Sequence, residues 1–103
     1  MKDIIFHRIY DTVRGFSAQG KPFVKKVRSG LVLAHKNKDG SVEFGYSSVH
    51  PLDVYDEKEG FARAMDNRAS NPDRASLPTR VRKVFPQVVK HAKKYFADGT
   101  FAV

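Results

Sequence analysis

The sequence predicts an α+β fold in which a three-stranded antiparallel sheet is followed by two helical segments that pack on one face of it. The first half of the chain is rich in β-branched and aromatic residues, which favour strands. An Asp39-Gly40 turn divides that half, and apolar residues at helical spacing fill the last third. A chain of 103 residues without repeats or linkers is expected to form one domain, residues 1–103.

The strands are predicted over three segments. Residues 4–13 form the first, with Ile5 and Ile9 on one face and aromatic side chains on the other, so coverage of both faces is expected. Residues 23–35 form the second, with a break or bulge at Ser29-Gly30. The Asp39-Gly40 turn then leads into a third strand, residues 42–48, and the last two strands form an antiparallel hairpin.

The first helix is predicted to begin after Asp53, which is a good N-cap residue, and to end near Ala69. Gly60 lies inside it, where a glycine costs about 1 kcal/mol relative to alanine and either permits close packing or marks a break. Residues 70–73 end this helix and open a loop.

The last helical segment combines an apolar stripe with a basic face. Pro78 suits its first turn, whereas Pro86 removes a backbone donor, so two helices or a kinked one are expected, with the longer piece over residues 86–97. On a helical projection the lysines fall at about 180–220° from the start of the stripe. The stripe consists of Val81, Val84, Phe85, Val88, Ala92, Tyr95 and Phe96, and the lysines opposite it are Lys83, Lys90 and Lys94.

Charge is segregated along the chain, whose net charge is +8. Residues 74–97 hold seven basic residues and residues 12–38 hold seven more, and neither block contains an acidic residue. Acidic residues gather instead at the start of the first predicted helix, where they suit the helix dipole. The two basic blocks have no such local reason, and this favours a polyanionic partner.

Several classes of site are disfavoured by the residue pattern. The chain has no cysteine, its four histidines lack short metal-ligand spacing, and no glycine pattern resembles a phosphate-binding loop. The pair His50 and Asp53 is weak support for a hydrolase, because a loop hydrogen bond and a helix cap explain both residues. We expect no enzyme activity, no metal and no cofactor. The short apolar run after Met1 and the lack of a membrane span favour a cytoplasmic protein.

One stretch resembles a pattern in small proteins of tailed bacteriophages. It runs from Gly45-Tyr46-Ser47 through Pro51-Leu52-Asp53-Val54-Tyr55 to Lys58-Glu59-Gly60, and then through Ala62 to Arg68-Ala69. The match covers about residues 42–69 and is typical of a shared βα unit, with no catalytic residue to carry over. His50 and Val49 depart from it. The resemblance implies a phage origin, a host-cytoplasm setting and an accessory role in host takeover, regulation or counter-defence.

These observations favour a small basic accessory protein that binds DNA or RNA without catalysis, with weak sequence preference. Basic residues among strand aromatics would also suit a single strand. The alternative is a protein that inhibits or modulates a host nucleic-acid enzyme or defence complex. The ten candidate nucleic-acid contacts are Lys25, Lys26, Arg28, Lys36, Arg80, Arg82, Lys83, Lys90, Lys93 and Lys94.

Overall fold

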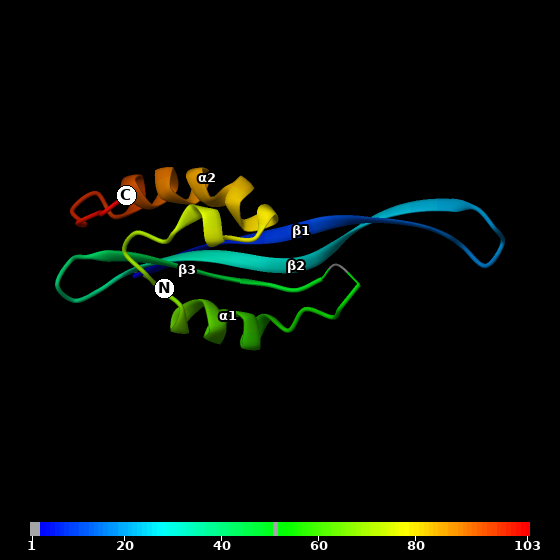
Figure 1. Cartoon of the computed structure of the whole chain (residues 1–103), viewed down its shortest axis with the longest axis horizontal. Helices are drawn as coiled ribbons and strands as arrows, with labels where there is room; N and C mark the ends of the chain where they lie inside the picture. The colour runs from blue at the N-terminus through cyan, green and yellow to red at the C-terminus, as the bar shows by residue number, and fades with distance from the viewer. Residues whose placement is uncertain (1–2, 51) are drawn as a thin grey trace.

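A three-stranded antiparallel sheet and two α-helices make up the fold within residues 3–50 and 52–103, which the computed structural model describes (Figure 1). Met1, Lys2 and Pro51 lie outside the described residues. The elements are β1 (Ile4–Phe16), β2 (Pro22–Lys36), β3 (Val42–Ser48), α1 (Glu57–Asp66), the short 3-10 helix η1 (Arg74–Ser76) and α2 (Thr79–Tyr95). The predicted α+β class and the order of its elements are confirmed.

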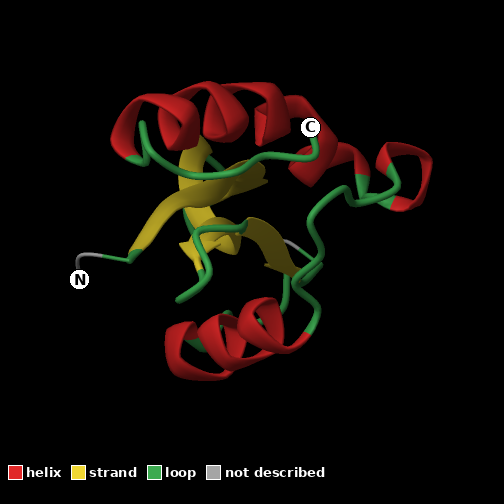
Figure 2. Cartoon of the chain, turned by 90° about the vertical axis from the view of Figure 1, so that its left-hand side faces the viewer, coloured by secondary structure: helices red, strands yellow, loops and turns green. Residues whose placement is uncertain are grey.

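The two helices cover opposite faces of the sheet, which differs from the expected packing on one face (Figure 2). In β2, Val32 and Ala34 join the core under α2, whereas Leu31 and Leu33 pack with Ala64 of α1. Successive strand residues point to opposite faces, so four consecutive buried residues require a cover on each side. The continuous apolar run of β2 is therefore the physical reason for the split.

The turn and the bulge of the sheet lie where the sequence predicts them. Gly40 has φ +91° in the turn between β2 and β3, and a bulge occurs in β2, where Ile9 pairs with Gly30 but Tyr10 pairs with Arg28. Both features were predicted. The first strand is covered less evenly than expected, because Ile9 is buried on the α2 side while Tyr10 on the other face is 54% exposed.

Helix α1 begins later than predicted. Asp56, and not Asp53, is its N-cap, and the Asp56 carboxylate accepts a hydrogen bond from the Glu59 N–H at 3.0 Å. The backbone N–H of Asp53 instead donates to the His50 carbonyl at 2.8 Å, in a turn before the helix. The chain then stays extended long enough to bring Tyr55 into the cluster under α1. Tertiary packing of Tyr55 thus accompanies the later helix start.

Helix α2 runs without interruption through Pro86, so the expected division into two helices is wrong. Pro86 is exposed, and the buried residues Phe85 and Val88 on either side of it anchor the helix to the sheet. Burial of the stripe offsets the lost hydrogen bond. The predicted stripe is buried or partly buried except for Tyr95, which is 49% exposed, and Val89, which lies outside the predicted stripe, is buried as well.

The C-terminal residues dock beside the start of β3. The Val42 N–H donates to the Thr100 carbonyl at 3.0 Å, and Phe101 packs against the core under α2. Neither helix of the described residues has the length and apolar content that crossing a membrane requires.

Candidate nucleic-acid interface

Strands β1 and β2 extend well beyond β3 as a two-stranded ribbon. β3 pairs with β2 from Gly30 to Lys36, so the pairs from Tyr10–Arg28 to Phe16–Pro22 lie past its end. We call residues 10–28 the arm and the rest the body. Figure 1 shows the arm projecting to one side of the helices, and the molecule measures 57 × 23 × 23 Å. The arm's seven residue pairs correspond to a length of about 20 Å.

The arm carries positive charge on both of its faces. Val13 pairs with Lys25, and Thr12 pairs with Lys26, so the two adjacent lysines point to opposite faces of the ribbon. Arg14 shares the face of Lys26, and Lys21 lies in the connecting loop. All four basic side chains are exposed, and residues 12–28 contain no acidic residue.

Apolar side chains are also exposed along the arm. Phe16 is 74% exposed near the tip, Val24 is 59% exposed and Tyr10 is 54% exposed at the base. Phe23 is more sheltered, because its ring lies over Gly15 and the Lys25 ammonium sits 6.0 Å from the ring centroid. An uncovered strand pair with apolar and cationic side chains is a surface available to a partner.

A groove of about 570 Å³ lies between the base of the arm and the start of α2. Arg8, Tyr10, Arg80 and Lys83 are among the residues that line it. The Arg80 guanidinium pairs across the groove with the Asp11 carboxylate at 3.0 Å. Lys83 therefore brings the basic face of α2 up to the base of the arm.

The rest of the basic face of α2 continues away from the arm. Lys90 and Lys94 follow Lys83 at helical spacing, about 10 and 16 Å along the axis, and both are exposed. Lys93 is exposed too, with its ammonium 5.8 Å from the ring centroid of Phe101. Because Lys83 borders the arm, the two basic blocks of the sequence meet at that groove.

Four of the ten candidate contacts serve the fold itself. Arg28 donates to both carboxylate oxygens of Glu57 at 2.8 and 3.1 Å, which lowers the pKa of Glu57 despite slight burial. Lys36 donates hydrogen bonds to both carboxylate oxygens of Asp98 at 2.9 and 3.0 Å, which lowers the pKa of that carboxyl.

The two arginines at the start of α2 have internal partners as well. Besides its ion pair with Asp11, Arg80 donates hydrogen bonds to the Ser48 hydroxyl and the Val49 carbonyl. Arg82 donates hydrogen bonds to the backbone carbonyls of Arg74, Ala75 and Leu77.

The other six candidates are exposed lysines, and none of them forms an ion pair within residues 3–50 and 52–103. They are Lys25, Lys26, Lys83, Lys90, Lys93 and Lys94. The candidate set omitted Arg14 and Lys21, which belong to the same arm. Their place in the acid-free run of residues 12–38 was the available signal.

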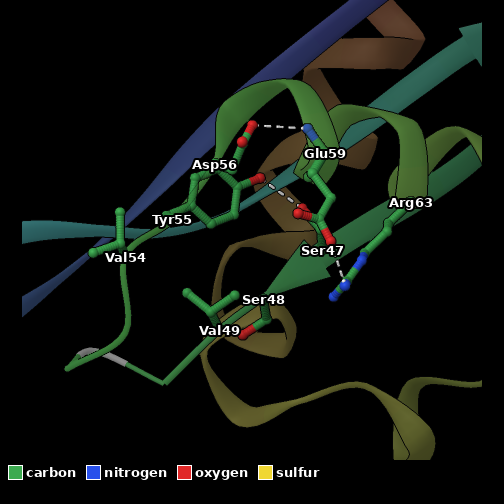
Figure 3. Close-up of a pocket in the computed structure, with 9 residues that line it drawn as sticks. Ser47, Ser48, Val49, Val54, Tyr55, Asp56, Glu59 and Arg63 are labelled. Atoms are coloured by element: carbon green, nitrogen blue, oxygen red, sulfur yellow. Dashed lines mark hydrogen bonds and ion pairs between the residues drawn. The ribbon is translucent and has the colours of Figure 1, made fainter.

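A second cavity, of about 220 Å³, lies between the end of β3 and the start of α1 (Figure 3). The Ser47 and Tyr55 hydroxyls point toward each other within it, 2.6 Å apart. Glu59 pairs with Arg63 at 2.6 Å, and Asp56 caps α1. Each of these polar groups has an intramolecular partner, so they provide local structure at this corner of the body.

The histidines have local partners as well. His50 Nδ1 accepts from the Leu52 N–H at 3.2 Å in an exposed loop, as a loop role predicts. His7 Nε2 and His91 Nδ1 lie 2.8 Å apart between β1 and α2. Among the described residues, no group of three or more His, Asp or Glu side chains is placed to hold a metal ion.

No protein-family model, curated protein or solved structure matches this chain. Residues 42–69 contain β3 and α1, whose close approach depends on two glycines. A Cβ on Gly45 would overlap the Ala64 carbonyl, and a Cβ on Gly60 would overlap the Tyr55 hydroxyl. Gly60 thus permits close packing, and both glycines have a structural role.

Proposed function

We propose that this protein binds nucleic acid without catalysis, through the arm and the exposed lysines of α2. The observation that carries the proposal is a projecting ribbon with no acidic residue from Thr12 to Arg28, whose base adjoins the basic face of a helix. Lysine and arginine side chains on such a surface can reach phosphates without first breaking internal ion pairs. A phage accessory setting would agree with this activity.

Binding of this kind has a measurable electrostatic signature. Each neutralised phosphate releases condensed counterions, so the logarithm of affinity falls with the logarithm of salt by about 0.9 per contact on duplex DNA. Four arm residues and two or three α2 lysines would make six contacts or so, which predicts a slope of about −5.

The test is a salt titration of affinity for a 30-bp DNA duplex, by fluorescence anisotropy. The double variant Lys25→Gln, Lys26→Gln is expected to make the slope shallower by about 1.8. Its control is Lys38→Gln, Lys58→Gln, which removes the same charge from two exposed lysines outside the arm. The control should lower the affinity slightly and leave the slope unchanged. Absence of binding at low salt, or equal slopes in the two double variants, would refute the proposal.

The exposed apolar residues of the arm favour a second candidate function, which is binding to a host protein. A groove of about 480 Å³ lies between the arm and the loop before α1, lined in part by Phe23, Val27 and Val54, and Val54 is 94% exposed. An inhibitor or modulator of a nucleic-acid enzyme or defence complex could use this surface. Recovery of one specific protein from nuclease-treated lysate, lost in Val54→Asp and kept in Lys90→Gln, would favour this reading.

A further inference from the structure

We infer that the arm enters the major groove of duplex DNA, with its two faces toward the two phosphate backbones that flank the groove. This inference rests on the proposed function and adds the class of nucleic acid and the mode of contact. Three properties of the arm carry it, namely its width, the placement of its charges and the spacing of its rings.

The width of the arm fits one kind of groove. A two-stranded ribbon has its strands about 4.8 Å apart and, with side chains, is about 10 Å across. The major groove of B-DNA is about 12 Å wide and admits such a ribbon, whereas the minor groove is about 6 Å wide. The major groove of duplex RNA is deep and narrow, and side chains cannot read it. The arm therefore fits duplex DNA best.

The basic residues of the arm lie on both of its faces, which suits a binding site with phosphates on two sides. Lys25 and Lys26 are adjacent in sequence and lie on opposite faces, with Arg14 on the face of Lys26. A ribbon inside a groove has a phosphate backbone on each side, so charge on both faces is useful there. A ribbon lying flat on one strand would use the charge of a single face.

The aromatic rings of the arm do not form a stacking platform. Phe23 lies on one face, while Tyr10 and Phe16 lie on the other and are six residues apart, which is about 20 Å along a strand. Proteins that bind single strands stack successive bases on neighbouring rings. The spacing in the arm is too wide for that, so a single strand is a poorer ligand than a duplex.

Inside the groove, the side chains on the face that carries Arg14 point toward one phosphate backbone, and their ends can also reach the base edges at the groove floor. Arginine donates to guanine N7 and O6, and the methyl groups of Thr12 and Val24 can contact thymine methyl groups. Thr12, Arg14 and Val24 are all exposed, and Arg14 is paired with Val24 across the ribbon. Lys83 at the base of the arm would then reach a phosphate at the edge of the groove.

The experiment compares the full-length protein on a 30-bp DNA duplex, the RNA duplex of the same sequence and one DNA strand, at 100 mM salt. We expect the DNA duplex to bind at least tenfold more tightly than the other two. Dimethyl sulfate footprinting on the duplex should show protection of guanine N7 in the major groove and none of adenine N3 in the minor groove.

Two single variants test the two-sided contact. Lys25→Gln and Lys26→Gln should each make the salt slope shallower by about 0.9, and both variants are expected to fold because these side chains are exposed. An effect in one variant alone, protection of adenine N3, or tighter binding to RNA or a single strand would overturn the groove inference. If salt-dependent binding persists in any of those cases, the proposed function stands. If the protein binds none of the three probes at low salt, both fail.

Discussion

The arm and the body contain the same two strands in opposite environments. In β2 the residues from Pro22 to Lys26 are all exposed, whereas those from Ser29 to Ala34 are all buried. The difference arises because β3 and both helices cover the body end of the ribbon and leave the arm bare (Figure 1). The buried contacts that stabilise the fold therefore lie in the body, and the arm is available for binding.

The border between the two regions is a β-bulge. Ser29 is the extra residue, it is fully buried, and its carbonyl accepts from the Val49 N–H at 2.8 Å. Bulges increase the local twist of a strand pair. The bulge at Ser29 therefore lies where the sheet ends and the free ribbon begins.

The largest expected difference concerns two phenylalanines. Phe85→Ala should lower the free energy of unfolding by about 3–5 kcal/mol, because Phe85 is 2% exposed and its ring packs against that of Phe44. Phe16→Ala should change it by less than about 0.5 kcal/mol, because Phe16 is 74% exposed. Urea unfolding followed by circular dichroism measures both. Similar losses in the two variants would show that the arm contributes to the core.

A smaller difference is expected between two glycines. Gly45→Ala should cost about 1–3 kcal/mol, because the new Cβ would overlap the Ala64 backbone and push α1 away from β3. Gly15→Ala should cost less, because the atom in its way is Cζ of Phe23 at 2.8 Å, on an exposed ring that can turn aside. Thermal unfolding of the two variants checks this. A Gly15→Ala protein as unstable as Gly45→Ala would mean that the arm is packed rigidly.

The smallest effect is a pH dependence that belongs to the body. Burial, and then the proximity of His91, lowers the pKa of His7 below 6.5. The unfolded chain therefore binds more protons than the folded one as the pH falls below about 6.5. Stability from this pair is present above that pH and is lost as the pH falls through the lowered pKa of His7.

Melting temperatures between pH 7.5 and 5 measure this effect. The decline on acidification should be weaker in His7→Gln than in the parent protein, and unchanged in the control His50→Gln, whose ring lies in an exposed loop. An equal decline in all three proteins would assign the acid sensitivity to other groups.

Sequence patterns predicted well those features that depend on neighbouring residues. The Asp39-Gly40 turn, the bulge at Ser29 and the buried stripe of α2 depend on local backbone preference and on periodicity. The start of α1 was missed because Asp53 and Asp56 are both good caps, and the choice between them depends on where Tyr55 packs. Pro86 does not divide α2, because burial of the apolar stripe around it offsets the lost hydrogen bond. That burial depends on tertiary packing, which the sequence pattern does not show.

The candidate interface also has some features that the sequence indicates and others that depend on tertiary packing. Two acid-free basic blocks and an α+β order of elements could be predicted from the sequence, because charge and periodicity are properties of the chain. Three other features depend on the folded structure: the helices lie on opposite faces, Arg28 and Lys36 are held in ion pairs, and Lys25 and Lys26 lie on a projecting arm. The physical reason is that ion pairing, coverage and projection depend on residues distant in sequence, here Glu57, Asp98 and the end of β3.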